Sequence, residues 1–223
     1  AHGVQIMQMC EAFSKSQIQN SKIEVELIIP WRFNPIKQDS FGYYGIERNF
    51  KITKIPSLDS VRFGKIGFLI QSFSFAKFAA IYLFFKKADV IYSRDELPLF
   101  WLSFFKRNIF WGPPKNIFWE AHRGDFSFIA KSVLKKCRGI ITITQGLKDF
   151  YIQNGANGEK ILVVSDGVDL KKFDIDISKE KAREKLDLPQ DKKIIVYTGH
   201  LYAWKGADVL AEASNFFNED VLF

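Results

Sequence analysis

The 223-residue sequence has few of the residues that build metal sites or disulfide frameworks. Its two cysteines, Cys10 and Cys137, stand far apart and in no CxxC or CxxH spacing. This pattern argues against a disulfide-rich secreted domain and a cysteine-built zinc site, and it favours a reducing cytosol. The three histidines, His2, His122 and His200, fall in separate loops, and no carboxylate pair has ligand spacing. We therefore expect no metal site.

The motifs of several common enzyme classes are also absent. The sequence has no GxSxG nucleophile elbow, no Gly-Lys-Ser/Thr phosphate loop and no GxGxxG loop. Its 32 basic residues outnumber its 25 acidic ones and give a net charge of +7, but they are scattered as pairs without a long basic run. We therefore expect no nucleic-acid partner. The charge favours small anionic partners such as nucleotides, or an acidic lipid surface.

Aromatic residues are abundant, at 16% of the chain with 23 Phe. Many of them lie in residues 66–85 and 97–111. The first stretch has the length that spans a bilayer, but Gln71 and Lys77 interrupt it, and a lysine at mid-span costs about 2.5–3.5 kcal/mol on insertion. We expect a buried or surface-lying helix instead. Because lysines accompany the aromatic side chains, an anionic membrane surface is an expected partner.

Short apolar runs rich in Ile and Val alternate with longer helical patterns along the chain. Most of the runs are continuously apolar, as in strands that are covered on both faces. This rhythm predicts an α/β fold with a doubly wound, Rossmann-like parallel sheet. The predicted strands are residues 23–29, 90–92, 117–119, 140–144, 161–164 and 194–198, and the predicted helices are 4–16, 65–87, 96–105, 126–136, 146–153, 179–186 and 207–217.

The composition changes after residue 164. A polar stretch opens with Ser165-Asp166-Gly167, contains the breaker Leu188-Pro189-Gln190 and ends where the strand pattern restarts at Lys193. A polar, proline-marked crossing is typical of a domain boundary. We expect a first domain over residues 1–165, a linker over 166–192 and the start of a second domain over 193–223.

The two ends suggest that the chain is cut from a longer protein. Residues 1–3 run directly into a helical pattern, and residues 221–223 read as a strand that has just begun. Chains that form parallel sheets of this type usually begin with a central strand, which would precede residue 1. We therefore expect a fragment that lacks its first strand and most of its second domain.

Candidate functional residues follow the predicted strands, because ligands of open α/β sheets bind outside the carboxyl ends of the strands. Glu120 and His122 can supply a general acid or base, or stabilise charge; alternatively His122 only caps a loop. Arg94 can clamp a phosphate or carboxylate, or pair with a neighbouring acidic residue. Gly3 stands before a helix and can bring backbone N–H groups to an anion, or serve only as a cap.

A second candidate site is the loop that begins at Gly199 and His200 and leads into the last predicted helix. A glycine lets the backbone approach a ligand, and a helix N-terminus presents free N–H groups to an anion. Lys205 adds a full positive charge at that position. These features suit a diphosphate, although an ordinary turn with a solvated lysine fits the residues equally well.

Three segments resemble the retaining glycosyltransferases of the GT-B fold, specifically the family-four group. Residues 165–173, SDGVDLKKF, resemble the segment between its two domains, usually Pro-Asn-Gly-Val-Asp followed by a phenylalanine. Residues 196–210, VYTGHLYAWKGADVL, resemble the opening of its donor-binding domain. Residues 1–5, AHGVQ, resemble the end of its first glycine-bearing loop.

The resemblance implies a GT-B two-domain architecture that is truncated at both ends here. It implies an enzyme that moves a sugar from a nucleotide-sugar donor to a glycan or lipid-linked acceptor with retention of configuration. The protein would be cytoplasmic, at the inner face of the membrane where the acceptor is a lipid, and would need no cofactor or metal. The fragment itself would be inactive, because the paired-glutamate region of the donor domain lies beyond it.

The resemblance also implies roles for particular residues. Lys205, with Gly199 and His200, would bind the donor diphosphate, and His122 would face the donor sugar as the catalytic residue. Gly3, Arg94 and Glu120 would belong to the acceptor side of the cleft. The family often has arginine where His200 stands, which leaves Lys205 with less cationic help.

Two alternatives remain open at this point. One is a nucleotide-sugar epimerase of the same architecture, which an intact donor-domain sequence would distinguish. The other is a non-catalytic α/β module that binds anionic lipid or a partner through its basic, Phe-rich helices. Liposome binding without any nucleotide-sugar binding would favour the second.

Overall fold

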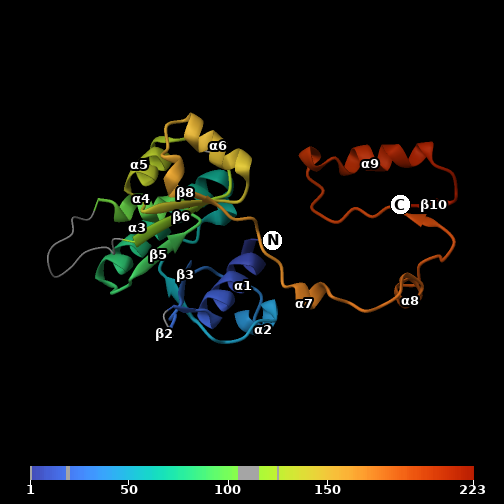
Figure 1. Cartoon of the computed structure of the whole chain (residues 1–223), viewed down its shortest axis with the longest axis horizontal. Helices are drawn as coiled ribbons and strands as arrows, with labels where there is room; N and C mark the ends of the chain where they lie inside the picture. The colour runs from blue at the N-terminus through green and yellow to red at the C-terminus, as the bar shows by residue number, and fades with distance from the viewer. Residues whose placement is uncertain (1, 19–20, 105–115, 125) are drawn as a thin grey trace. The chain divides into compact units, whose positions relative to one another are not determined.

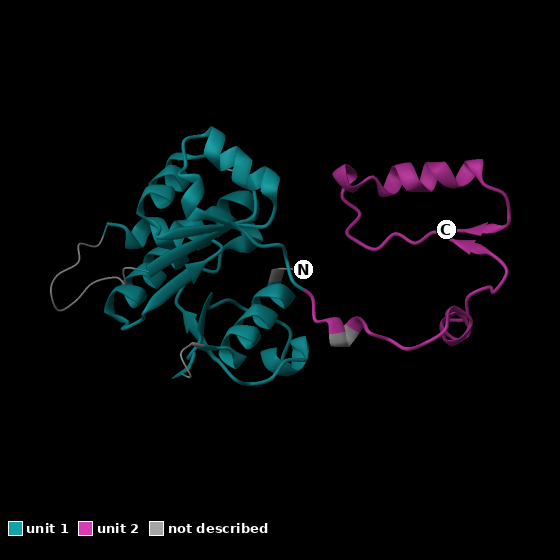
Figure 2. Ribbon diagram, in the orientation of Figure 1, with its two compact units in different colours: residues 1–167 teal, residues 168–223 magenta. Residues whose placement is uncertain are grey.

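The structure is a computed structural model and describes residues 2–18, 21–104, 116–124 and 126–223. The chain forms two compact units, Ala1–Gly167 and Val168–Phe223 (Figure 2). Figure 1 labels the helices of the first unit and several of its strands. Its helices are α1 (His2–Lys15), α2 (Ser40–Tyr44), α3 (Gly64–Phe85), α4 (Glu96–Leu102), α5 (Phe128–Lys136) and α6 (Gln145–Gln153), with 3₁₀ turns η1 (Val61–Phe63) and η2 (Gly158–Lys160).

The main sheet of the first unit has four parallel strands in the order β5-β6-β7-β8. These strands are β5 (Val90–Ser93), β6 (Asn116–Ala121), β7 (Gly139–Thr142) and β8 (Ile161–Val163). Phe118 of β6 pairs with Gly139 of β7, and a Cβ atom at Gly139 would lie 2.9 Å from the Phe118 ring. A side chain at position 139 would therefore force the Phe118 ring to move.

Two further strands, β3 (Glu26–Pro30) and β4 (Lys51–Ile55), form a separate parallel pair. The short strands β1 (Gln17–Ile18) and β2 (Ser21–Lys22) form an antiparallel pair. The strand predicted over 23–29 begins three residues before β3 begins and ends one residue before β3 ends. Strand β4 was missed, because Lys51 and Lys54 leave it without a continuous apolar run.

Helix α2 was also missed by the sequence pattern, because five residues are too few to show a helical period. Its ends are nevertheless well defined. The Asp39 carboxylate accepts hydrogen bonds from the backbone N–H groups of Phe41 and Gly42, and Gly45 ends the helix at φ 62°. An acidic N-cap and a left-handed glycine after the last turn are both stabilising ends for a helix.

Two apolar clusters hold the first unit together. The larger lies between the four-stranded sheet and its helices, and the smaller between α1, α2 and the β3–β4 pair. Large side chains at the centre of the first cluster include Leu102, Trp119 and Tyr151, while Met7, Cys10, Phe41 and Phe50 form the second. Parallel strands covered by helices confirm the predicted α/β fold class, with the strands divided between two sheets.

The second unit contains α7 (Leu170–Phe173), α8 (Lys179–Lys185), β9 (Lys193–Ile194), η3 (Ala203–Lys205), α9 (Ala207–Ala213), η4 (Ser214–Phe216) and β10 (Val221–Leu222). Strands β9 and β10 pair in parallel. The strand predicted over 194–198 is thus only two residues long, and the helix predicted over 207–217 ends in a 3₁₀ turn. Among the side chains described in this unit, none is buried.

Helix α3 has an unusual surface. Its buried residues are small or polar, namely Gly67, Gln71, Ala76, Ala79 and Ala80, while many of its large apolar side chains face outward. Residues 61–85 are long and apolar enough to cross a membrane, by length and composition only. The helix packs against α4 in this structure, and the large apolar side chains of its outer face are exposed.

A half-buried carboxylate, Glu26, joins the smaller sheet to α3. Glu26 accepts hydrogen bonds from the hydroxyls of Thr53 and Tyr82, the latter at 2.8 Å, and pairs with Lys86 at 2.9 Å and Lys51 at 3.3 Å. Burial raises the pKa of Glu26, but these hydrogen bonds outweigh it and lower the pKa to about 2. The ionised form therefore stabilises the fold.

We expect Glu26→Gln to lower the free energy of unfolding by up to roughly 3 kcal/mol at pH 7, the value of a shift of this size. Because the folded-state pKa is lowered, the contribution is complete above the unfolded pKa of about 4.3 and is lost as pH falls toward 2. Urea unfolding at pH 7 and pH 3 measures this difference.

The matched control is Glu47→Gln, which removes a 2.9 Å ion pair between Glu47 and Lys15 on the exposed surface. Such pairs contribute about 0.2–1 kcal/mol. Equal losses in the two variants, or a loss at Glu26 that does not shrink at pH 3, would contradict the assignment.

Candidate active site

The carboxyl ends of β5 and β6 bring together three of the residues singled out from the sequence. Arg94 follows the last residue of β5, Glu120 lies near the end of β6, and His122 follows it. The Arg94 Nε lies 2.9 Å from His122 Nε2 and 3.4 Å from the Glu120 carboxylate. The two adjacent strands end at one edge of the sheet and bring these three residues together, while the roles assigned to them stay predictions.

Glu120 is the centre of the cluster and is only 4% exposed. Its two carboxylate oxygens have different partners. One accepts a hydrogen bond from the Tyr92 hydroxyl at 2.5 Å, and the other lies 2.5 Å from His122 Nε2. Burial, together with this hydrogen bond to Glu120, raises the pKa of Tyr92, so the phenol stays neutral and acts as a donor.

Two residues outside the predicted set complete the cluster. The Gln5 side chain, from the first turns of α1, accepts a hydrogen bond from Arg94 Nη2 at 3.0 Å and donates one to the Asp166 carboxylate. Asp166 belongs to the segment that the sequence analysis assigned to the linker. Its contact with Gln5 joins residues 161 positions apart, which no local pattern reveals.

Three residues of this cluster have side chains of the kinds that bind metal ions. Single ligand atoms of Glu120, His122 and Asp166 all lie within 4.8 Å of one another. The Arg94 guanidinium, however, contacts both Glu120 and His122. The guanidinium lies against two of the three groups that would bind a metal and repels a divalent cation there, so the donor set suits a hydrogen-bonded cluster better than a metal.

Gly3 has a different setting from the one expected. It was predicted to end a loop before a helix, but α1 begins at His2, so Gly3 lies within the first turn. A Cβ atom at this position would clash with the hydroxyl of Tyr44 in α2. The missing side chain therefore makes room for Tyr44. A role in binding acceptor stays a prediction.

The predicted donor residues lie in the second unit and are exposed. Lys205 ends η3, and its ammonium lies 4.4 Å from the centre of the Trp204 ring, a cation–π distance. The His200 backbone carbonyl accepts a hydrogen bond from the Tyr197 hydroxyl at 2.8 Å. Gly206 takes φ 70° and links this turn to α9.

Comparison with known proteins supports the fold first. No protein-family model matches the chain. HepE of Anabaena, solved in complex with UDP and glucose, matches with a TM-score of 0.60 at 15% identity, covering 98% of this chain and 55% of that chain. HepE in complex with UDP-glucose matches with a TM-score of 0.54 at 16% identity, covering 81% of this chain and 47% of that chain. The chain thus shares a fold with this protein.

Sequence similarity then points to a class of enzyme. An uncharacterised glycosyltransferase of Methanocaldococcus jannaschii is 27% identical over 85 residues, or 38% of this chain and 21% of that protein. The D-inositol 3-phosphate glycosyltransferase of Streptosporangium roseum is 40% identical over 73 residues, or 33% of this chain and 16% of that protein. The chain is similar to glycosyltransferases, and it spans about a fifth of the length of these curated relatives.

Glu120→Gln is expected to destabilise the first unit by about 3 kcal/mol, because it leaves the largely buried Arg94 guanidinium without its counter-charge. Chemical unfolding monitored by tryptophan fluorescence measures the loss. The matched control is Glu96→Gln, which breaks a 3.5 Å pair with the exposed Arg123 and should cost less than about 1 kcal/mol. Comparable costs would show that the Glu120 charge is not compensated by Arg94.

Proposed function

We infer that the protein is a glycosyltransferase that moves a sugar from a nucleotide-sugar donor to a glycan or lipid-linked acceptor, with retention of configuration. Similarity to two glycosyltransferases supports the transfer of a sugar. The structures of HepE contain UDP or UDP-glucose, which supports a uridine-type nucleotide sugar as donor. The single observation that carries the proposal is the cluster of Arg94, Glu120 and His122 at the carboxyl ends of parallel strands.

In this proposal the first unit contributes the acceptor side of the site, where His122 is the catalytic residue that faces the donor sugar. The cluster carries two carboxylates, Glu120 and Asp166, against one guanidinium. Excess negative charge suits a sugar whose anomeric carbon becomes positively charged as the bond to the leaving group breaks. The carboxylate oxygens also accept hydrogen bonds from sugar hydroxyls.

The second unit contributes the binding of the diphosphate. The leaving nucleoside diphosphate gains negative charge in the transition state, and a preorganised ammonium stabilises it without a metal. Lys205 supplies that charge, and the backbone beside Gly199 and His200 approaches the phosphates. We accordingly propose a cytoplasmic enzyme that needs no cofactor or metal.

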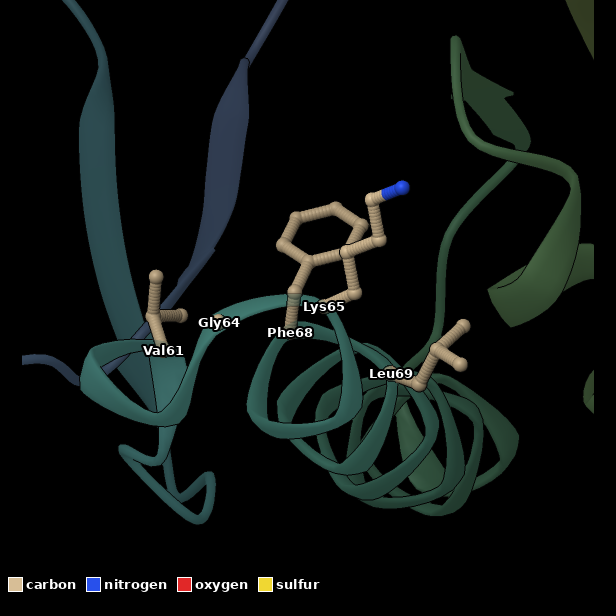
Figure 3. A pocket seen from close by; sticks show the side chains of 5 residues that line it. All are labelled: Val61, Gly64, Lys65, Phe68 and Leu69. Atoms are coloured by element: carbon tan, nitrogen blue, oxygen red, sulfur yellow. The ribbon is translucent and has the colours of Figure 1, made fainter.

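The outer surface of α3 supports a membrane-bound acceptor. Side chains that face solvent at the start of this helix include Ile66, Phe68 and Leu69, which are 72%, 56% and 53% exposed. A hollow of about 540 Å³ lies here, lined by Val61, Gly64, Lys65, Phe68 and Leu69 (Figure 3). Apolar side chains beside a lysine are the composition that binds an anionic lipid interface.

The diphosphate role predicts that Lys205→Ala lowers kcat/KM of the full-length enzyme by about 10²–10³, the cost of removing one preorganised charge from a developing oxyanion. The matched control is Lys193→Ala at the first residue of β9, an exposed position, which should change kcat/KM by less than about threefold. Small, equal effects at the two positions would show that Lys205 is only a solvated lysine.

The membrane role predicts that the protein sediments with anionic phospholipid vesicles at low salt and less so at high salt. The double variant Phe68→Ser/Leu69→Ser should lose this binding. Leu162→Ser, which changes an equally exposed residue on β8, should retain it. No sedimentation of the unaltered protein at low salt, or equal binding by both variants, would exclude α3 as the lipid-binding surface.

A further inference from the structure

A hollow of about 420 Å³ lies between α5 and the turn that follows α6. Of the described residues that line it, three are lysines and none is acidic. Lys131 and Lys135 lie one turn apart on α5, and Lys160 ends η2. A concave surface whose charges have a single sign focuses its electric field and attracts ions of the opposite sign. The hollow is therefore suited to an anion.

The ammonium groups of these lysines keep their charge available for a ligand. None of the three forms an ion pair with a described residue. The Lys131 ammonium lies 4.6 Å from the centre of the Phe126 ring, a cation–π contact that orients the ammonium without neutralising it. The charge of Lys160 reaches Cys137, the residue after α5, where it opposes the rise in pKa that burial causes at the thiol.

Apolar side chains line the hollow beside the lysines. Phe126 and Leu134 are partly buried and pack against the larger apolar cluster of the first unit, to which Ile140 of β7 belongs. Because the core holds these side chains, the apolar surface is already formed before a ligand binds. Ligand sites commonly combine such a lining with a few polar groups in a volume of roughly 300–1,000 Å³. The anion that fits best therefore carries an apolar group.

The hollow lies away from the candidate active site. Ile140 stands near the beginning of β7 and Lys160 directly precedes β8, whereas Arg94, Glu120 and His122 lie at the carboxyl ends of β5 and β6. None of these last three residues lines the hollow. A ligand bound here would leave the proposed sugar-transfer site free.

We propose that this hollow binds an organic phosphate, whose phosphate group contacts Lys131, Lys135 and Lys160 and whose apolar group covers Phe126 and Leu134. Lysine binds phosphate as a compact charge with three rotatable donors, which suits three flexible side chains around one opening. A soluble aryl phosphate and the headgroup region of phosphatidic acid share this chemistry. The inference does not depend on sugar transfer, so it stands or falls separately from the proposed function.

The first test is a titration of the isotope-labelled 223-residue chain with phenyl phosphate, followed by NMR of the backbone amides. We expect the signals of residues 131–135 and 154–157 to shift. Phenyl phosphate should bind at least about tenfold more tightly than inorganic phosphate, because only the ester removes apolar surface from water. No shift of these signals, or equal affinities for the two compounds, would overturn the proposal.

The double variant Lys131→Gln/Lys135→Gln tests the charges. We expect it to weaken phenyl phosphate binding at least about tenfold, because two charged contacts are lost. The matched control, Lys22→Gln/Lys54→Gln, removes the same net charge at exposed positions outside the hollow and should weaken binding less than about twofold. Equal weakening by the two double variants would overturn the proposal.

Lys135 also stands in the last turn of α5, where a cation stabilises a helix, so thermal unfolding checks that the double variant is folded. If it is not, Lys160→Gln alone should weaken phenyl phosphate binding at least about threefold. Unchanged binding by a folded Lys160→Gln protein would contradict the proposal.

Vesicles of phosphatidic acid distinguish the two sources of the phosphate. The protein used is Phe68→Ser/Leu69→Ser, which lacks the proposed lipid-binding surface on α3. Vesicle binding that is abolished by adding Lys131→Gln/Lys135→Gln would support a lipid headgroup as the ligand. Binding of phenyl phosphate without binding of these vesicles would support a soluble phosphate. Vesicle binding that persists in the lysine variant, with no binding of phenyl phosphate, would overturn the proposal.

Discussion

The burial of Glu120 is the constraint on which the candidate site depends. A carboxylate taken out of water loses several kcal/mol of hydration, and it stays ionised only where donors and a counter-charge replace that loss. Glu120 gains a phenol donor from β5, an imidazole from the loop after β6 and a guanidinium from the loop after β5. These groups can converge only because the two strands are adjacent and parallel. The buried charge of Glu120 therefore depends on the pairing of β5 with β6.

A second carboxylate, Glu26, is also surrounded by hydrogen-bond donors and positive charges, and there it holds the fold together. Glu26 also brings lysine, tyrosine and threonine side chains to one carboxylate, and it ties β3 and β4 to α3. The difference lies in where the two carboxylates stand. Glu26 begins its strand, whereas Glu120 lies at the carboxyl end of β6, the edge of a parallel sheet where ligands bind. Position in the sheet, more than local chemistry, makes Glu120 the candidate functional carboxylate of the two.

The sequence predicts features that depend on neighbouring residues, and it does not predict those that depend on contacts between distant segments. Strands β5 to β8 are continuous apolar runs, so their positions were predicted within about two residues. From these, the topology rule placed Arg94, Glu120 and His122 at one edge. Gln5, Tyr92 and Asp166 were not predicted as site residues, because their roles depend on contacts between distant segments. In the second unit, no neighbouring element buries the apolar residues that the structure describes. The strand predicted over 194–198 is correspondingly short.

The ends of the four-stranded sheet affect the behaviour of the protein at high concentration. In the part of the chain that the structure describes, β5 and β8 each pair with one neighbour, and they expose Val90 and Leu162. Unpaired backbone groups beside apolar side chains are a template for strand addition between molecules. The net charge of +7 opposes such association through mutual repulsion between chains, and salt screens that repulsion. We therefore expect the colloidal stability of this chain to fall as ionic strength rises.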